Sequence, residues 1–329
     1  PFLIAMAYEP IPVPEPTILE GGISRLQVQV GENVQDRTCI TSSSGAVYEL
    51  GRMLKEAIYG QVHSGCTLEL VENNIYKRTS KLVAVKIISR SRLSQLQGTT
   101  QEDPIKEIAA LQFVGNDHPN VMGQIECISD NNHFYSVMNF SNGGELYDLV
   151  DANGKLSEVQ ARHYFAQMLE GLEHLQNIGV CHRDMSLENM LVTRDGNCKI
   201  IDLGMCLRCP VDSDGNSLPI PPQGACGKRN YISPESLANK DPFIGPLVDI
   251  WALGVILFIL LTGVPPVETS SPLDPRFRLI CSGGLKQMLL QWNMHISEEA
   301  MDLLQRILQG TPSDRLTIPE IKAHPWMNV

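Results

Sequence analysis

The sequence predicts an α+β protein with two lobes, a strand-rich first part followed by a helical second part. Short strand-like runs cover Val47–Leu54, Gly60–Val62 and Leu82–Ile88, and their β-branched and apolar residues favour strands. After Gly143-Gly144 the apolar residues recur at helical spacing. Strands first and helices later indicate an α+β fold with a cleft between the lobes.

Further elements follow from caps and periodicity. Asp103 followed by Pro104 predicts the start of a helix over Ile105–Val114, because aspartate caps a first turn and proline is tolerated there. His133–Phe140 reads as another strand.

Three helices are expected in the second part. A capping box from Ser157 to Gln160 opens the first, and 249–262 is apolar enough to be a buried core helix. Ser297 caps the third, which ends before Gly310.

Composition narrows the class of protein. The 329 residues are 43% apolar, which is ordinary for a globular chain with a sizeable core. The net charge of −11 argues against nucleic acid or an anionic membrane as the main partner. The longest apolar run, Ile250–Val264, is too short to span a bilayer comfortably. Nine irregularly spaced cysteines favour a reducing, intracellular location, while the first residue, Pro1, leaves a targeting segment open.

The first 46 residues show no sustained periodicity and are expected to be an extension, either loose or lying over the domain. Alternating prolines from Pro10 to Pro16 favour an extended, polyproline-like stretch. We expect the two lobes to cover 47–141 and 142–329.

Several motifs occur in a fixed order. Residues 83–86 read Val-Ala-Val-Lys, 182–189 read His-Arg-Asp-Met-Ser-Leu-Glu-Asn, and 202–204 read Asp-Leu-Gly. Ser-Pro-Glu at 233–235 and His-Pro-Trp at 324–326 follow. Together they resemble the eukaryotic protein kinase superfamily over roughly residues 46–329.

This resemblance implies a bilobal kinase fold, ATP and Mg²⁺ as cofactors, and protein substrates. It implies that Lys86 holds the phosphates with Glu107 as its acidic partner, and that Asp184 orients the substrate hydroxyl. Asn189 and Asp202 would bind Mg²⁺. The residues that it places around the nucleotide are Leu54, Gly60, Val62, Ala84, Lys86, Met138, Asn139, Ser141 and Leu191.

The motifs also imply two supporting contacts and a group. Buried Asp249 should accept N–H bonds from the 182–189 loop, and Glu235 should pair with Arg315. The chain looks similar to the calcium/calmodulin-dependent and AMP-activated kinase group. Glu188 stands where tyrosine kinases have arginine, which favours Ser/Thr specificity.

The sequence departs from the family at the phosphate-binding loop. Lys55 and Ala57 replace the first two glycines, so that only Gly60 remains, and we expect weaker or altered ATP affinity. The longer interval between Val62 and Lys86 predicts an enlarged hairpin around 64–80.

A second departure concerns two positions at once. Ser186 stands where Ser/Thr kinases have a lysine, and Lys228 stands where they have a threonine. Either Lys228 supplies the catalytic cation from the opposite side of the site, or both positions have drifted in a weakened enzyme.

The sequence also gives expectations for regulation and for substrate preference. Residues 218–232 contain no Ser or Thr, so a phosphate at the usual activating position is not expected, and Asp212 or Asp214 could stand in as partner of Arg183. Glu145 and Glu188 resemble the acids that meet upstream arginines in basophilic kinases, and this resemblance implies substrates with arginine upstream of the target residue.

Two functions remain in view. The first is an active Ser/Thr kinase, and the second is a pseudokinase that serves as a nucleotide-binding or scaffold module. The motif residues Lys86, Asp184, Asn189 and Asp202 favour the first, whereas the departures favour the second.

Overall fold

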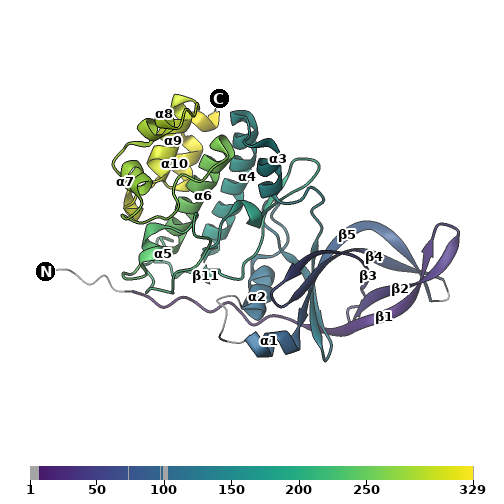
Figure 1. Ribbon diagram of the computed structural model, residues 1–329. Helices are drawn as coiled ribbons and strands as arrows, with labels where there is room; N and C mark the ends of the chain where they lie inside the picture. The colour runs from purple at the N-terminus through teal and green to yellow at the C-terminus, as the bar shows by residue number, and fades with distance from the viewer. Residues whose placement is uncertain (1–6, 73, 97, 99–102, 329) are drawn as a thin grey trace. The chain divides into compact units, whose positions relative to one another are not determined.

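The computed structural model describes residues 7–72, 74–96, 98 and 103–328. They form two compact units (Figure 1). The strand unit comprises the described parts of Pro14–Asp117 and Met122–Ser141. The helical unit comprises those of Pro1–Val13, His118–Val121 and Asn142–Val329.

The strands are β1 (Leu19–Val30), β2 (Asn33–Ser42), β3 (Val47–Ala57), β4 (Gly60–Glu72), β5 (Ile75–Ser89), β6 (Gln124–Ser129), β7 (His133–Asn139), β8 (Val180–Cys181), β9 (Met190–Val192), β10 (Cys198–Ile200) and β11 (Leu207–Arg208). The α-helices are α1 (Arg90–Leu96), α2 (Pro104–Val114), α3 (Leu146–Asn153), α4 (Glu158–Asn177), α5 (Pro234–Ala238), α6 (Gly245–Thr262), α7 (Pro275–Cys281), α8 (Leu285–Gln291), α9 (Glu298–Ile307) and α10 (Ile318–Ala323). Short 3₁₀ turns cover Leu187–Asn189, Pro312–Asp314 and Pro325–Asn328. This mixture confirms the predicted α+β class.

The strand unit is a closed barrel in the order β1-β2-β3-β4-β5-β7-β6 (Figure 1). Most neighbours pair antiparallel, but β1 closes the barrel by parallel pairing with β6 and, further along, with β5. The long β4–β5 hairpin confirms the enlargement predicted around 64–80. Barrel closure removes the unpaired edges that an open sheet would leave.

The first 46 residues are not the extension that we expected, because residues 14–46 belong to the strand unit. Residues 19–42 form β1 and β2, joined by a tight turn in which Val30 pairs with Asn33. The missed signal was the alternation of Leu26, Val28 and Val30 with glutamines, which is typical of a strand with one buried face. Ahead of it, Ile11 N donates to Arg208 O at 2.9 Å, so the part of the proline-rich segment before Pro14 belongs to the helical unit.

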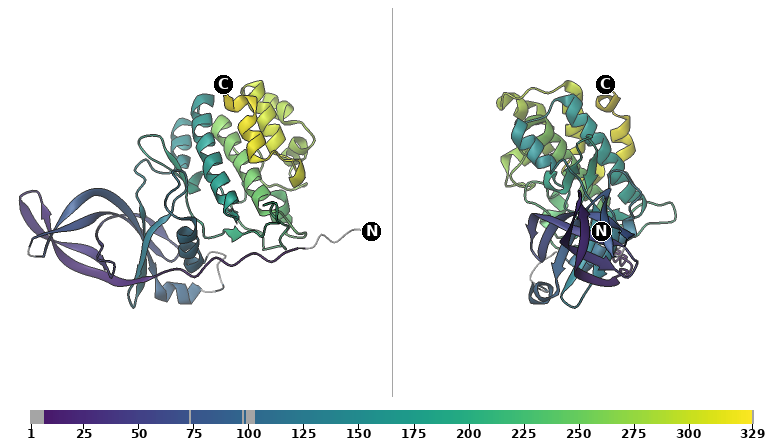
Figure 2. Two further views of the ribbon diagram at one scale, coloured as in Figure 1. Left: turned by 180° about the vertical axis from the view of Figure 1, so that it is seen from behind. Right: turned by 90° about the vertical axis from the view of Figure 1, so that its right-hand side faces the viewer.

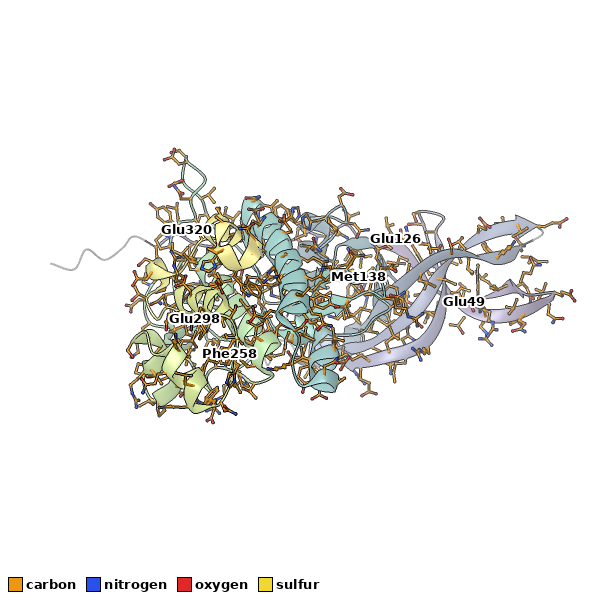
Figure 3. All side chains as sticks on the ribbon, turned by 90° about the horizontal axis from the view of Figure 1, so that it is seen from above. Glu49, Glu126, Met138, Phe258, Glu298 and Glu320 are labelled. Atoms are coloured by element: carbon orange, nitrogen blue, oxygen red, sulfur yellow. The ribbon has the colours of Figure 1, made fainter. Side chains whose placement is uncertain are left out.

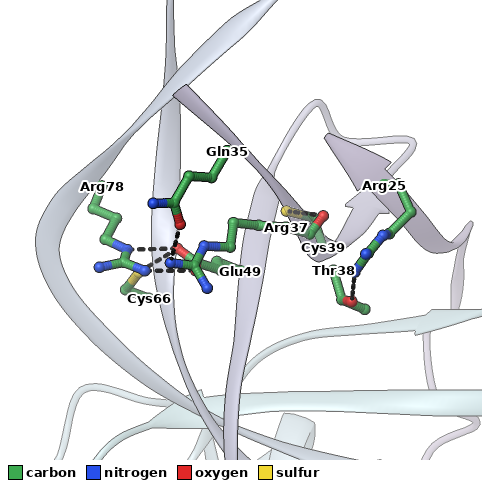
Figure 4. Close-up of polar contacts among 8 residues, drawn as sticks. All are labelled: Arg25, Gln35, Arg37, Thr38, Cys39, Glu49, Cys66 and Arg78. Carbon is green, nitrogen blue, oxygen red and sulfur yellow. Dashed lines mark hydrogen bonds and ion pairs between the residues drawn. The ribbon is translucent and has the colours of Figure 1, made fainter. Parts of the chain in front are cut away.

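A buried carboxylate connects β2 to the rest of the barrel (Figure 4). Glu49 on β3 is only 5% exposed and accepts two bonds from the Arg78 guanidinium on β5, at 2.6 and 2.7 Å. Arg37 on β2 lies 3.6 Å from the same carboxylate, and the Cys66 thiol on β4 also faces it. The paired charges allow a carboxylate to be buried in the barrel.

The helical unit is built around α6, which is buried almost all the way round and packs against α4 and α9 (Figures 1 and 2). The predicted caps are confirmed, since Ser157 accepts from Gln160 N and Ser297 from Ala300 N. By length and composition α6 could cross a membrane, but 83% of its apolar window is buried inside the protein. It is therefore a core helix, as predicted.

A buried ion pair connects α5 to the C-terminal part of this unit. Arg315, whose side chain is fully buried, donates to both oxygens of Glu235 at 2.6 and 2.7 Å. The guanidinium also donates to Leu247 O at 2.7 Å and lies over the Trp251 ring. The predicted Glu235–Arg315 pair is confirmed.

We expect Glu235→Gln to lower the free energy of unfolding by about 3 kcal/mol, because it leaves a buried guanidinium without its counter-charge. Glu298 (Figure 3) provides the control. It pairs with Lys286, and both side chains are more than half exposed, so Glu298→Gln should have little effect. Urea unfolding of both variants is the measurement, and equal losses would contradict the argument.

Candidate active site

In the strand unit, two of the predicted site residues form an ion pair. Lys86 on β5 lies 2.5 Å from the Glu107 carboxylate on α2. Asp103 caps α2 as predicted, accepting from Ile105 N at 2.9 Å, and so sets where Glu107 stands in the first turn. The predicted partner therefore holds the lysine side chain.

Strand register gathers other predicted residues around Lys86. Val62 on β4 lies directly opposite Lys86, and Ala84 lies opposite Met138 on β7 (Figure 3). Directly opposed residues share a face of a sheet, as do residues two apart on a strand. The same face of the barrel wall therefore carries Lys86 beside the apolar side chains of Val62, Ala84 and Met138.

The other predicted nucleotide residues are spread over both units. Asn139, at the end of β7, donates to Asn116 through its side chain at 3.0 Å, and Ser141 follows it in the strand unit. Leu54 on β3 is 39% exposed. Leu191 belongs to the helical unit, where it lies opposite Lys199 on β10.

The turn between β3 and β4 is a tight hairpin in which Ala57 pairs with Gly60. A Cβ at Gly60 would come 1.9 Å from Ile87 O, so only glycine allows β4 to approach β5 here. Tyr59 is buried and packs with Ile88 and Ile108. Lys55 and Ala57 thus both pair within a regular hairpin, Lys55 with Val62 and Ala57 with Gly60.

In the helical unit, a buried carboxylate holds the loop 182–189. Asp249 on α6 is fully buried and accepts His182 N at 2.7 Å and Arg183 N at 2.8 Å. This confirms the predicted contact. The His182 ring spans the loop, with Nε2 on Ile201 O at 2.9 Å and Nδ1 accepting Asp184 N at 3.2 Å.

Asp184 is oriented by two groups. The Asn189 amide donates to its carboxylate at 2.9 Å and to its backbone oxygen at 2.7 Å. Lys228 N donates to the other carboxylate oxygen at 3.1 Å. Because the Asn189 nitrogen is used in this way, its amide oxygen is the atom left for a cation.

Backbone strain marks the same region. Among the described residues, five non-glycine residues have φ between 46° and 68°, and three of them are asparagines, which tolerate this conformation. The other two are Arg183 and Asp202, each with φ of 68°. Such conformations persist where surrounding structure imposes them, often at functional sites.

Ser186 and Lys228, the two residues that depart together from the family pattern, lie beside Asp184. Lys228 Nζ donates to Ser186 Oγ at 2.6 Å and lies 3.7 Å from Asp184 Oδ2. Ser186 is fully buried, whereas the Lys228 side chain is 37% exposed. The structure therefore brings together Asp184, Ser186, Asn189 and Lys228, four positions that the motifs singled out.

Comparison with known proteins agrees with this geometry. Residues 60–327 match the protein kinase domain family. The chain belongs to the protein kinase family. It is 35% identical over 290 residues to CBL-interacting protein kinase 1 of Oryza sativa subsp. japonica, covering 88% of this chain and 57% of the relative.

Other relatives confirm the predicted group. The SNF1-related protein kinase catalytic subunit alpha KIN12 of Arabidopsis thaliana is 34% identical over 85% of this chain and 51% of its own length. The probable serine/threonine-protein kinase MARK-C of Dictyostelium discoideum is 32% identical over 86% of this chain and 33% of its own length. The kinase chain thus spans about half the length of the first relatives.

Arg183 of the kinase is held by carbonyl groups. Its guanidinium donates to Met205 O at 3.4 Å and Gly224 O at 3.3 Å. Asp212, considered above as a stand-in for an activating phosphate, instead accepts from Asp214 N and Asn216 N and closes its own turn. That suggestion for Asp212 is wrong, because its carboxylate is occupied locally.

The two candidate substrate-binding acids differ in their surroundings. Glu145 forms a capping box at the start of α3, so its carboxylate has a structural task. Glu188 has one buried carboxylate oxygen with no hydrogen-bond partner. Burial, and then the nearby Glu188 charge, raise the pKa of Tyr231. A buried unpaired carboxylate oxygen is costly, and Glu188, unlike Glu145, has a carboxylate oxygen without a structural partner.

Proposed function

We propose that the chain is the catalytic domain of a Ser/Thr protein kinase that transfers the γ-phosphate of ATP to a protein hydroxyl. The observation that carries this proposal is the Asp184 carboxylate, oriented by Asn189 and Lys228 on a loop that Asp249 holds. Relatives named as serine/threonine-protein kinases support the residue specificity.

Protein kinases use ATP, and the residues present fit a bound Mg·ATP. We propose that the Lys86 amine, held by Glu107, neutralises phosphate charge, and that Val62, Ala84, Met138 and Leu191 line the adenine. Leu54, Gly60, Asn139 and Ser141 complete this set. Gly60 keeps the β3–β4 hairpin close to β5, as its short approach to Ile87 requires.

The donor set also fits Mg²⁺. Asn189 offers an amide oxygen and Asp202 a carboxylate, both hard ligands of the kind that Mg²⁺ prefers. No group of three or more His, Cys, Asp or Glu side chains suited to a metal occurs in the described part of the chain. Mg²⁺ sites commonly take one or two protein carboxylates plus substrate phosphates. When bound, the ion neutralises charge on the phosphates.

The chemical step then follows from the positions of the protein groups. The substrate hydroxyl oxygen attacks the γ-phosphorus, the bond to the β–γ bridging oxygen breaks, and its electron pair leaves with ADP. Asp184 orients the hydroxyl and accepts its proton. His182 is buried and bonded to Ile201 O and Asp184 N, so it supports the loop.

Substrate preference, partners and location complete the proposal. The unpartnered oxygen of Glu188 supports recognition of arginine upstream of the target residue. Relatives named CBL-interacting support a regulatory protein partner for the full-length protein. The free cysteines support a reducing, intracellular location.

We expect Asp184→Asn to lower phosphate transfer by at least about 10²-fold, with the thermal shift on Mg·ATP binding retained. Radiolabelled γ-phosphate transfer to a mixture of Arg-containing Ser and Thr peptides is the measurement. A wild-type protein that binds Mg·ATP without any transfer would instead support the pseudokinase alternative.

We expect Glu188→Gln to raise KM by about tenfold for a peptide with arginine upstream of the target serine, because one charge-assisted bond is lost. A matched peptide with alanine there should be unaffected. Glu299→Gln, on the exposed start of α9, is the control variant. An equal loss with both peptides would argue against a substrate contact.

We expect turnover to survive treatment with a broad-specificity protein phosphatase. Between residues 218 and 232 the only hydroxyl side chain is Tyr231, which is 9% exposed, and Arg183 already bonds two carbonyls. Turnover before and after treatment is compared, with removal of phosphate checked by mass spectrometry. Loss of activity that returns on incubation with ATP would show phosphate control.

A further inference from the structure

We propose that Lys228 is the catalytic cation that contacts the transferring phosphate, and that Ser186 and Gly227 position it. Lys228 lies on the activation segment, residues 202–235, which runs from Asp-Leu-Gly to Ser-Pro-Glu. The inference rests on the proposed function and assigns one further residue to that site. The sequence left two explanations for Ser186 and Lys228 open. Either the catalytic cation has moved from position 186 to position 228, or both positions have drifted in a weakened enzyme. The contacts around Asp184 favour relocation.

The reaction needs a cation at this point. The transferring phosphate carries charge on three oxygens and approaches a hydroxyl that Asp184, itself an anion, must orient. Without a nearby positive group the carboxylate and the phosphate repel one another at short range. Preorganised Lys or Arg side chains supply this stabilisation in phosphoryl transfer.

Lys228 has the geometry for this role. Its amine lies 3.7 Å from Asp184 Oδ2 and donates to Ser186 Oγ at 2.6 Å. An ammonium group carries three N–H donors, so a phosphate next to Asp184 can still be bonded. The side chain is 37% exposed, which is enough for a substrate to reach it. In this role the amine acts by its charge and transfers no proton.

Ser186 positions the amine. Its hydroxyl is fully buried on the loop that Asp249 holds by two backbone bonds, so the acceptor for Lys228 is well fixed. A serine is short enough to leave room for a long side chain that arrives from the other segment. If the two positions had drifted independently, there would be no reason for Lys228 and Ser186 to be bonded to each other, as they are.

Gly227 positions the backbone. Its φ is 95°, and a Cβ there would come 2.9 Å from Arg183 O. Glycine therefore allows the activation segment to approach the loop closely. This approach lets Lys228 N donate to Asp184 Oδ1 at 3.1 Å. The lysine is thus attached to the site at both its backbone and its amine.

The first test removes the charge. We expect Lys228→Met to lower kcat by about 10²-fold and Lys228→Arg to retain most of the rate. Lys240 is an exposed lysine of the same unit, so Lys240→Met is the control and should match wild type. Calorimetry with Mg·AMP-PNP and Mg·ADP adds a readout that needs no turnover. Lys228→Met should weaken AMP-PNP binding by about tenfold and leave ADP binding unchanged.

The second test moves the charge back to the loop. Lys228→Thr alone should be as slow as Lys228→Met, and the double variant Ser186→Lys with Lys228→Thr should recover at least about tenfold in kcat. A merely structural role for Lys228 predicts no such rescue, and melting temperatures identify any variant that fails to fold.

The outcomes separate this inference from the proposed function. A wild-type protein without phosphate transfer defeats the proposed function, while the AMP-PNP comparison still tests the Lys228 contact. Lys228→Met with wild-type kcat and wild-type preference for AMP-PNP over ADP overturns the inference. A folded double variant no faster than Lys228→Thr also overturns it.

Discussion

The candidate site depends on one buried carboxylate. Asp249 lies within the apolar helix α6 and binds the backbone N–H groups of His182 and Arg183. Burial raises the pKa of Asp249, while the two N–H bonds act in the opposite direction. A carboxylate in this position is unfavourable unless the loop supplies its donors. The core helix and the loop that bears Asp184 therefore stabilise one another, and the strained backbone of Arg183 is held by the same contact.

Much of the fold could be predicted because the signals were local. The caps at Asp103, Ser157 and Ser297 set the starts of three helices, and each depends only on residues within one turn. The first two strands were missed although the alternation of Leu26, Val28 and Val30 with glutamines is also a local signal. What spacing could not indicate is the parallel pairing of β1 with β5 and β6, far along the chain. Helix α1 spans only seven residues and has no fully buried residue. Its two leucines, Leu93 and Leu96, pack only partly against the barrel core, so its apolar pattern is too short to predict a helix.

The contacts of the candidate site could be predicted only in part. The pairs Lys86–Glu107 and Glu235–Arg315 followed from motif order, and both are present. Asp212 failed as a partner of Arg183 because its own turn takes its carboxylate, and such short-range competition is not visible in spacing. The roles of Ser186 and Lys228 could not be decided from the sequence, because each position taken alone looks like the loss of the family's usual residue. Only the bond between them makes the two changes one arrangement.

Placing the cation on the activation segment changes what controls the site. A lysine at position 186 would be fixed by the Asp249 contact whatever the activation segment does. Lys228 reaches Asp184 only while Gly227 stays against Arg183 O, so any displacement of residues 224–228 would withdraw the charge. The other end of this segment is held by the β8–β11 pair and by the bond from Ile11 to Arg208. On this proposal, the order of the segment determines whether the positive charge is present at the site. Contacts that hold the segment would then provide the ordering that a phosphate on Ser or Thr cannot provide in residues 218–232, which contain neither.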